Sequence, residues 1–365
     1  MKFIPPKTNK VLVSMGGQAV GSIALTPDGL CAFQYDAQWL LHGFSISPYE
    51  LPLDNRVFIA NHHPFDGGFG VFDDCLPDGW GSLILDRLLK KEGINPNSLS
   101  LLDRLSLVGS SGRGALCFEP DYSEMNLSAY DSIETIAREA SNILSSDSYD
   151  GDGIENLYKR GGSPGGARPK ASVLIDGVEW LVKFQAKGDS DDIGKKEYDY
   201  SLLAKKCDIE MPETRLLENR YFAVKRFDRT LEGEHIHCVS MAGLLQADYR
   251  IPSIDYKHIF QVCHDLTRNQ ADLWKVFSLM CFNYAIDNKD DHAKNFAFLH
   301  DDMGWHFAPA FDLLPSDGMN GYRTTSINDS IVPQDNDLIA LAIQFGLDKK
   351  KAEKRLQSIL HEVKQ

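Results

Sequence analysis

The run Asn283-Tyr-Ala-Ile-Asp-Asn-Lys-Asp-Asp-His-Ala-Lys-Asn-Phe296 places carboxylates, an imidazole, an ammonium and a side-chain amide in one short stretch. It follows residues 273–282, which are apolar nearly all round and therefore predict a helix buried in a core. A buried helix can hold the loop that follows it in a fixed position. We therefore expect residues 283–296 to carry the chemistry of this chain.

Within this run, Asp290 and Asn295 are five residues apart, which is the spacing of the catalytic Asp and the metal-binding Asn on one loop of protein kinases. Asp312 follows Asn295 by seventeen residues. An Asp base, an Asn ligand and an Asp ligand, in that order, suit phosphoryl transfer. Asp290 would accept or orient the proton of the substrate hydroxyl. Asn295 and Asp312 would bind Mg²⁺ that bridges the phosphates of ATP.

A glycine-rich stretch, residues 161–170, precedes an apolar strand. Its backbone N–H groups could approach phosphates because no side chain stands in the way, although the glycines alone would equally fit a flexible turn. The Asp176-Gly177 pair predicts a two-residue hairpin between two strands. On the second strand, Lys183 falls on the face opposite Trp180. It could be a lysine that contacts phosphate or an edge lysine that reaches solvent.

Glu197, at the start of the next predicted helix, is the natural carboxylate partner of Lys183, although it could instead favour its own helix N-terminus. Two other interpretations of residues 283–296 remain. Asp287, Asp290, Asp291 and His292 could form a metal cluster for hydrolysis, or the acidic residues could simply end a helix. Asp312 and the glycine-rich stretch favour phosphoryl transfer over both.

Length, net charge and cysteine content limit the classes of protein to which this chain can belong. The 365 residues suit two domains, or one domain followed by a two-lobed one. A net charge of −14 argues against direct binding of nucleic acid by the chain as a whole. The seven cysteines are scattered and never spaced as CxxC, which favours buried free thiols. With neither a signal core nor an apolar run of membrane-spanning length, we expect a cytoplasmic protein without a membrane partner.

Strand patterns dominate residues 10–50, and helical patterns follow at 74–93 and 100–108. Residues 145–153 are interpreted as a polar linker rather than a calcium loop. Sheet-rich sequence then gives way to mainly helical sequence after residue 271. The predicted fold class is α+β, with a small N-terminal α+β subdomain before a two-lobed, protein-kinase-like catalytic domain with a helical C-lobe. We place the parts at 1–125, 126–235 and 236–365.

Five motifs, in order, resemble the HipA family of bacterial serine/threonine-protein kinases, the toxins of type II toxin–antitoxin pairs. The motifs are Phe72-Asp-Asp-Cys-Leu-Pro-Asp-Gly-Trp-Gly81, Ser163-Pro-Gly-Gly-Ala-Arg-Pro-Lys170, Lys225-Arg-Phe-Asp-Arg229, Asp290-Asp-His-Ala-Lys-Asn295 and Phe311-Asp312. The resemblance covers nearly the whole chain.

The resemblance implies roles residue by residue. Residues of the glycine-rich loop would cover the phosphates of ATP, namely Gly165, Gly166, Ala167, Arg168 and Lys170, with Lys183 as the ATP lysine. Backbone groups of Lys225 and Phe227 would hold adenine. His292 would lie close to ATP, with Lys294 also among the nucleotide-binding residues. Ser163 matches the serine that family members autophosphorylate, which ejects the loop and silences the kinase.

The resemblance also implies partners. The substrate would be a translation-related protein such as an aminoacyl-tRNA synthetase. A helix-turn-helix antitoxin would bind the chain and supply an indirect contact with DNA. The alternative from another class is a non-catalytic, nucleotide-binding co-repressor subunit of an antitoxin–DNA complex, which would have no need of Asp290.

Overall fold

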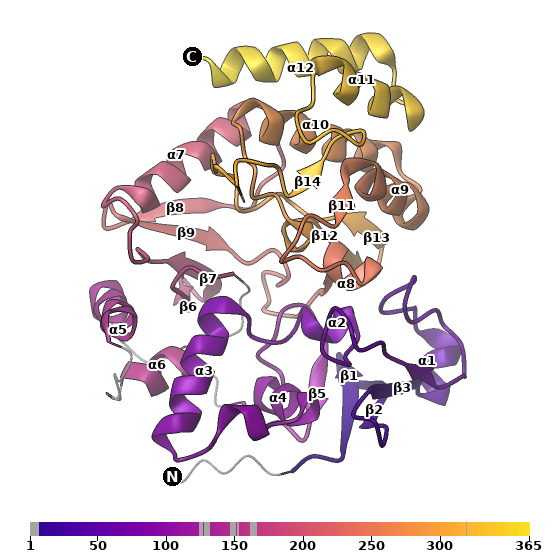
Figure 1. Cartoon of the computed structure of the whole chain (residues 1–365), viewed down its shortest axis with the longest axis vertical. Helices are drawn as coiled ribbons and strands as arrows, with labels where there is room; N and C mark the ends of the chain where they lie inside the picture. The colour runs from indigo at the N-terminus through magenta and orange to yellow at the C-terminus, as the bar shows by residue number, and fades with distance from the viewer. Residues whose placement is uncertain are drawn as a thin grey trace. The chain divides into compact units, whose positions relative to one another are not determined.

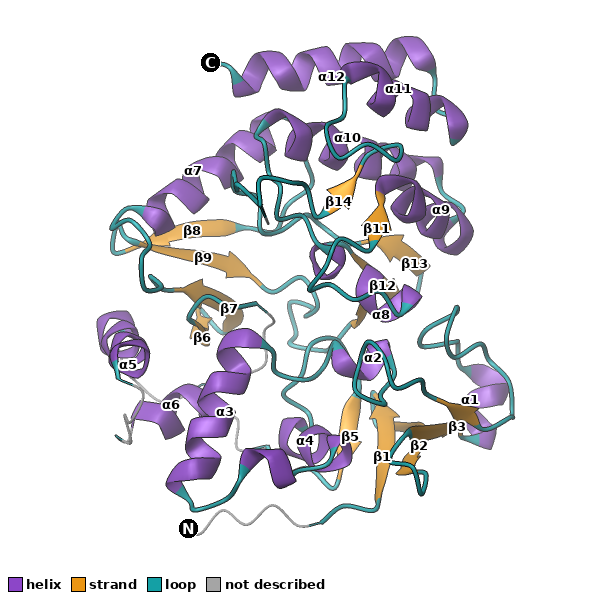
Figure 2. Ribbon diagram, viewed as in Figure 1, coloured by secondary structure: helices purple, strands orange, loops and turns teal. Residues whose placement is uncertain are grey.

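The computed structural model describes residues 7–123, 127, 132–146, 151, 153–160, 166–318 and 320–365, which combine helices with mostly antiparallel sheets (Figure 1; Figure 2). The chain divides into two compact units. The first contains Met1–Gly194 and Arg215–His237, and the second contains Lys195–Thr214 and Cys238–Gln365. The predicted α+β class is confirmed.

The first unit begins with a five-stranded sheet in the order β4-β3-β2-β1-β5. Its strands are β1 (Lys10–Met15), β2 (Gln18–Leu25), β3 (Cys31–Tyr35), β4 (Phe58–Ile59) and β5 (Cys117–Glu119). The helices of this part are α1 (Ala37–His42), α2 (Gly70–Asp73), α3 (Gly79–Lys91) and α4 (Leu101–Val108), with the 3-10 helix η1 (Pro96–Ser98). The predicted strands are therefore found up to Tyr35.

The helix predicted over 74–93 begins only at Gly79. Gly79 has a φ of +39° and the preceding residue Asp78 is extended, so the chain turns sharply before α3 starts. The helix predicted at 100–108 is confirmed as α4, and Ser100 caps it by accepting a hydrogen bond from the backbone of Asp103.

A four-stranded sheet completes the first unit, in the order β6-β7-β9-β8. Its strands are β6 (Lys170–Ile175), β7 (Val178–Lys183), β8 (Thr214–Leu217) and β9 (Tyr221–Lys225). The predicted hairpin joins β6 to β7, and its turn residues Asp176 and Gly177 both have positive φ, at 53° and 78°. That conformation is what a two-residue turn of this kind requires.

One face of this sheet shares a core with three helices that precede it in the sequence. Helix α3 contributes Trp80, and α5 (Ile133–Ser145) contributes Ile136, while α6 (Gly153–Lys159) packs beside them. They meet Trp180 and Val182 of β7, which are both almost fully buried. The N-terminal part of the chain is therefore joined to the four-stranded sheet by a continuous apolar core.

The second unit is mainly helical (Figure 1). Its helices are α7 (Ile193–Lys206, whose first two residues belong to the first unit), α8 (Met241–Leu245), α9 (Tyr256–Thr267), α10 (Gln270–Ala285), α11 (Asp335–Gln344) and α12 (Lys349–Val363). The sheets are β10 (His237–Ser240), β12 (Ala297–Asp301) and β13 (Gly304–Phe307) in the order β10-β12-β13, and a parallel pair of β11 (Ile254–Asp255) and β14 (Thr325–Ser326).

Helix α10 is buried along its length, with Phe277, Met280 and Phe282 fully inaccessible, as the apolar pattern predicted. The hairpin predicted at 296–310 is confirmed as β12 and β13. The mainly helical character predicted after 271 is wrong for residues 308–334, where β14 is the named strand among loops and turns.

All seven cysteines lie within the described residues and are free, six of them buried, as predicted. The predicted linker at 145–153 falls largely outside the described residues. Among the helices of the described parts, none combines the length and apolar character needed to cross a membrane.

Candidate functional site

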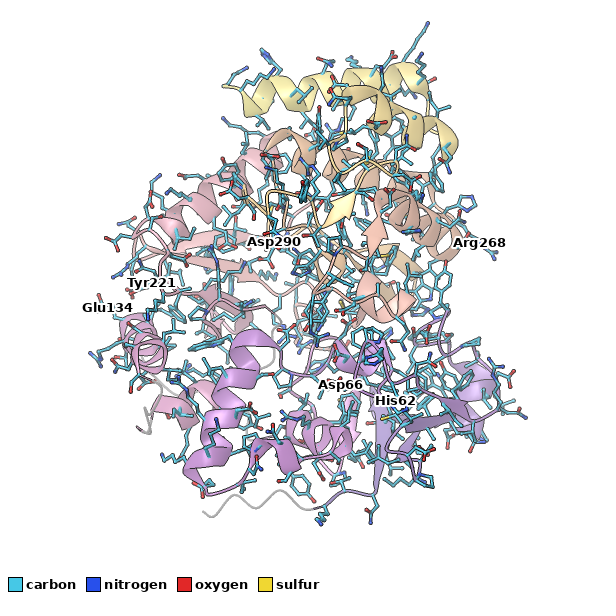
Figure 3. All side chains as sticks on the ribbon, in the orientation of Figure 1. His62, Asp66, Glu134, Tyr221, Arg268 and Asp290 are labelled. Atoms are coloured by element: carbon cyan, nitrogen blue, oxygen red, sulfur yellow. The ribbon has the colours of Figure 1, made fainter. Side chains whose placement is uncertain are left out.

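Asp290, which is labelled in Figure 3, lies in the loop that joins α10 to β12 and is an exposed residue. The loop leaves α10 through Asp287, whose φ of 53° turns the chain back on itself. Asn295 ends the loop in the 3-10 helix η2 (Ala293–Asn295). The side-chain amide of Asn295 donates a 2.9 Å hydrogen bond to the backbone carbonyl of Asp290. The predicted base and the predicted Asn ligand are therefore tied together directly.

A series of hydrogen bonds between buried side chains supports this loop. The backbone N–H of Asp290 donates to Asn288 Oδ1 over 3.1 Å, and Asn288 Nδ2 donates to Asn283 Oδ1 over 3.0 Å. Asn283 Nδ2 in turn donates to the hydroxyl of Tyr256, which donates to Asp291 Oδ2 over 2.8 Å. Since α10 supplies Asn283 and α9 supplies Tyr256, two helices determine where the loop sits.

Asp291 is the last residue in this series of hydrogen bonds, and it is almost completely buried. Burial raises the pKa of Asp291 to about 7, against the opposing effects of the Tyr256 hydrogen bond and the Arg323 charge. Thr325 of β14 donates its hydroxyl to the Asp291 carbonyl and its N–H to the Asp291 carboxylate. Burial, and secondly the charge of Asp291, raise the pKa of Tyr256 well above its usual value. Tyr256 is therefore a neutral donor.

The loop is also held by Arg323, which is itself buried. Its guanidinium donates to the Asn288 carbonyl over 2.9 Å and pairs with Asp287 Oδ1 at 3.3 Å. Thr324 binds the Lys289 carbonyl through both its N–H and its hydroxyl, each at 2.9 Å. Residues 323–325 thus clamp the same loop that α9 and α10 support.

These contacts overturn the metal-cluster interpretation of the acidic run. Asp287 pairs with Lys289 and Arg323, whereas Asp291 is buried against Tyr256. Within the described residues, no group of three or more His, Cys, Asp or Glu side chains is placed to hold a metal ion. The acidic residues of the loop therefore point to different partners.

Asp312 adopts a left-handed backbone conformation, with a φ of 56°, in the segment that follows β13. Its side chain is half-buried, and the next residue, Leu313, is anchored in the core. Left-handed φ is uncommon outside glycine, although Asp and Asn tolerate it best. The sequence showed that Asp312 follows the loop but contained no sign of this backbone geometry.

Tyr249 is a residue of this site that sequence reasoning missed. The ammonium of Lys294 lies 4.1 Å from the centroid of the Tyr249 ring, and the ring of His292 lies 5.9 Å from it. A cation over an aromatic face is held electrostatically. Tyr249 therefore orients two predicted nucleotide-binding residues. Its sequence neighbours, Asp248 and Arg250, form no recognisable motif.

In the first unit, Lys170 of β6 and Lys183 of β7 are directly opposite each other in the antiparallel register. Lys170 is buried and Lys183 is half-buried, with the Lys183 ammonium 5.6 Å from the centroid of the Phe222 ring. Like charges directly opposite on a sheet repel each other. Two such lysines beside the glycine-rich loop form a local positive centre that suits an anion.

The other predicted residues of the glycine-rich loop differ in their surroundings. Ser163 and Gly165 lie outside the described residues. Gly166 and Ala167 lie in the bend before β6, and the guanidinium of Arg168 pairs with Asp189 at 3.2 Å. Arg168 is therefore at least partly neutralised by a neighbouring carboxylate.

The predicted hinge begins where β9 ends. The strand predicted over 221–229 stops at Lys225, because Arg226, Asp228 and Arg229 turn into a buried ion-pair cluster with Glu179 of β7. Burial alone would raise the pKa of Asp228, but the Arg226 and Arg229 charges outweigh it and hold that pKa far below its usual range.

This ion-pair cluster also reaches the N-terminal part of the chain. Gly114 N–H donates to Asp228 Oδ2 over 2.8 Å, and Arg229 donates to the carbonyls of Gly112 and Gly114 over 3.1 Å. Lys225 and Phe227 alternate with the cluster residues along the chain. Their backbone is thereby placed by buried side chains that the resemblance had not singled out.

Glu197 is buried on α7, in the part of that helix that belongs to the second unit. The C-terminal end of α7 is tied to α12, since Arg355 donates to the backbone carbonyl of Cys207 over 2.7 Å. A carboxylate buried to this extent requires polar partners. Its predicted pairing with Lys183 stays a prediction.

Comparisons with known proteins match both the N-terminal and the C-terminal part of the chain. A model of the HipA-like C-terminal domain matches residues 162–365, and a model of the HipA N-terminal domain matches residues 11–119. Over 347 residues the chain is 25% identical to "Putative kinase Y4dM" of Sinorhizobium fredii, covering 88% of this chain and 81% of that protein. "Putative kinase Y4mE" of the same organism is 31% identical over 118 residues, 29% of this chain and 28% of that protein.

Among solved structures, the chain is similar to one in the complex of the Shewanella oneidensis MR-1 toxin–antitoxin system HipA, HipB and its operator DNA. The TM-score is 0.71 at 18% sequence identity, over 97% of this chain and 90% of that chain. At this identity, the similarity establishes a shared fold.

Proposed function

Because the chain belongs to the HipA family, we propose that it is an ATP- and Mg²⁺-dependent protein serine/threonine kinase that acts as the toxin of a toxin–antitoxin pair. The observation that carries the proposal is the loop of Asp290 and Asn295, in which hydrogen bonds from Asn288 and Asn295 hold the backbone of the exposed Asp290. Phosphoryl transfer depends mainly on positioning and electrostatic stabilisation, so a rigidly supported loop is what this chemistry requires.

Asp290 would accept or orient the proton of the attacking substrate hydroxyl. Its exposure suits that role, because a protein substrate must bring its hydroxyl within hydrogen-bond reach of the carboxylate. The neighbouring Asp291 is unsuited to it, because it is buried and bonded to Tyr256. Two adjacent carboxylates thus take different roles that their surroundings decide.

Asn295 and Asp312 would hold Mg²⁺. The amide nitrogen of Asn295 is engaged with the Asp290 carbonyl, so the amide oxygen is the atom that suits a hard cation. Two protein ligands fit the manner in which Mg²⁺ binds, since it usually keeps several waters and takes its remaining ligands from phosphates. When bound, the ion would neutralise charge that develops on the transferred phosphoryl group.

The nucleotide would be held by the glycine-rich loop together with Lys170 and Lys183, whose opposed charges are best compensated by phosphate. Lys225 and Phe227 would bind adenine through their backbones, and His292 and Lys294 would complete the nucleotide contacts. Glu197 would pair with Lys183, and Ser163 would be the site of autophosphorylation. The proposed parts are the subdomain 1–125, the N-lobe 126–235 and the C-lobe 236–365.

The partners proposed are a translation-related protein, such as an aminoacyl-tRNA synthetase, as substrate and a helix-turn-helix antitoxin as inhibitor. DNA would be contacted through the antitoxin, because a chain of net charge −14 is repelled by the phosphate backbone. This arrangement corresponds to the Shewanella complex, which contains HipA, HipB and operator DNA.

The proposal is tested by incubating the protein with γ-labelled ATP, Mg²⁺ and a cell extract, and mapping labelled peptides by mass spectrometry. Asp290→Asn should abolish transfer while leaving ATP binding intact. Asp302→Asn is the matched control, because Asp302 is an exposed acid in the turn between β12 and β13. Release of free phosphate without any phosphoprotein would identify a hydrolase. ATP binding without either product would favour the co-repressor.

A further inference from the structure

The turn made by Asp78, Gly79 and Trp80 lies against the C-terminal end of the glycine-rich loop, and the proposed function leaves it without a role. Both backbone groups of Gly166 are bound there. Its N–H donates to Asp78 Oδ1, and its carbonyl accepts from the Trp80 N–H over 3.1 Å. A third bond runs from the indole nitrogen of Trp80 to the Lys170 carbonyl over 2.9 Å.

Asp78 uses its carboxylate in an unexpected way. It occupies the N-cap position of α3, where an Asp side chain ordinarily accepts a hydrogen bond from the first turn of its own helix. No such cap bond is present, and the carboxylate accepts from Gly166 instead. The first turn gains a different acceptor, because the Trp80 N–H is satisfied by the Gly166 carbonyl. The helix and the loop therefore complete each other's hydrogen bonding.

Gly79 allows the two segments to approach this closely. A Cβ added at Gly79 would lie 2.7 Å from the Gly166 carbonyl oxygen and 2.8 Å from the Cα of Ala167. Both atoms belong to backbone, which cannot move aside without shifting the loop. The φ of +39° at Gly79 is also a conformation that residues with a side chain rarely adopt.

Trp80 makes the support rigid. Trp80, at the N-terminal end of α3, is 1% exposed and packs in the core formed by α3, α5, α6 and the four-stranded sheet. The turn is therefore fixed by the same core that fixes β6 and β7. What the turn contacts, by contrast, is Gly166, and a glycine has high conformational freedom on its own.

We propose that residues 78–80 are positioning residues for nucleotide binding. They fix the C-terminal end of the glycine-rich loop and the start of β6, and so place Lys170 for the phosphates of a nucleoside triphosphate. This inference rests on the proposed function, because it takes the loop and Lys170 as the phosphate-contacting groups. It assigns the N-terminal subdomain a direct part in ATP affinity.

The effect should fall on affinity rather than turnover. A loop already anchored at one end loses less conformational entropy when a ligand orders it, so anchoring lowers the cost of binding. None of the three residues is proposed to contact the transferred phosphoryl group. Loss of the anchor should therefore raise the Kd and KM for ATP and leave kcat at saturating ATP nearly unchanged.

The test measures ATP binding by calorimetry, KM and kcat by phosphoryl transfer, and backbone amide exchange of Gly166, in the full chain. Asp78→Ala and Gly79→Ala should each weaken ATP binding by about tenfold, the size expected for one charge-assisted hydrogen bond, and speed exchange at Gly166. Asp78→Asn keeps an oxygen acceptor and should recover most of the affinity. Gly93→Ala is the control, because Gly93 has a φ of +75° with nothing within 4 Å of its added Cβ.

The outcomes separate the alternatives. Unchanged ATP affinity in Asp78→Ala, with faster exchange at Gly166, would overturn the positioning role while leaving the kinase proposal intact. Tighter binding in both Asp78→Ala and Asp78→Asn would also overturn it, because the carboxylate would then be competing with phosphate for the Gly166 N–H. Absence of ATP binding by the wild-type chain would instead refute the proposed function itself.

Discussion

The hydroxyl of Tyr256 donates a 2.8 Å hydrogen bond to the carboxylate of Asp291, and both side chains are almost completely buried. The bond links α9 to the loop of the proposed catalytic base, which follows α10. Asn283 of α10 donates to the same hydroxyl over 3.0 Å. One phenol thus connects two helices with the loop between α10 and β12.

Replacing this hydroxyl should destabilise the protein and reduce its activity. Tyr256→Phe leaves the Asp291 carboxylate and the Asn283 amide each short of a buried partner, which costs about 1–3 kcal/mol. Urea unfolding measures the loss. Tyr322→Phe is the control, because Tyr322 is 53% exposed. Equal stability of the two variants would contradict the role of the network.

Asp291 should make stability fall as the pH rises. Its pKa in the folded protein is raised to about 7 by burial, whereas in the unfolded chain it is about 3.9. Between these values the folded state binds the proton and the unfolded state does not, so stability decreases with pH. The contribution is fully present below about pH 4 and is lost as the pH passes 7.

The matched variant for this effect is Asp291→Asn, which removes the titration and keeps hydrogen-bonding atoms. Unfolding free energies measured from pH 5 to 8 should decline more steeply for the wild type than for the variant. Parallel pH profiles would show that Asp291 does not titrate in this range.

Removing one of the two opposed lysines should remove the stabilisation that ATP confers. Lys183→Met relieves the repulsion with Lys170, but it also removes the proposed partner of the buried Glu197, so the two effects on the stability of the nucleotide-free protein oppose each other. The same variant should lose most of the thermal stabilisation that ATP confers on the wild type. Lys187→Met, at an exposed position, controls for the change in net charge. Undiminished ATP stabilisation would contradict the phosphate role of Lys183.

The buried ion-pair cluster should tolerate loss of its central carboxylate poorly. Asp228→Ala removes one of the two carboxylates that the buried guanidinium groups of Arg226 and Arg229 share, and leaves them only Glu179, at a cost of about 3–5 kcal/mol. Asp176→Asn removes the charge of the 84%-exposed carboxylate that pairs with Arg215, keeps a residue that tolerates the positive φ of the turn, and should cost less than about 1 kcal/mol. Chemical denaturation measures the loss of unfolding free energy in both variants. Equal losses would show that the cluster is structurally unimportant.

Local sequence rules recovered the elements of this protein whose signals are short-range. The Asp176-Gly177 turn, the helix at 100–108 and the apolar α10 each follow from neighbouring residues. The helix predicted at 74–93 begins only at Gly79, because residues 74–76 turn back onto α2 and Asp78 is extended and bound to Gly166, which is distant in sequence. The strand predicted at 221–229 ended early because Glu179 and the backbone of residues 112–114 draw the arginines into a buried cluster.

The sequence by itself determined the order of the chemical groups: an Asp, an Asn and an Asp at kinase spacing, preceded by glycines and a strand lysine. Spacing along the sequence is a covalent property, so it can be read without knowledge of the fold. Tertiary structure alone decided which of two adjacent carboxylates is exposed, because burial of Asp291 depends on Tyr256, Arg323 and Thr325. It also brought Asp78 to Gly166, since that hydrogen bond joins segments whose proximity arises only when their helices and sheet bury a common core.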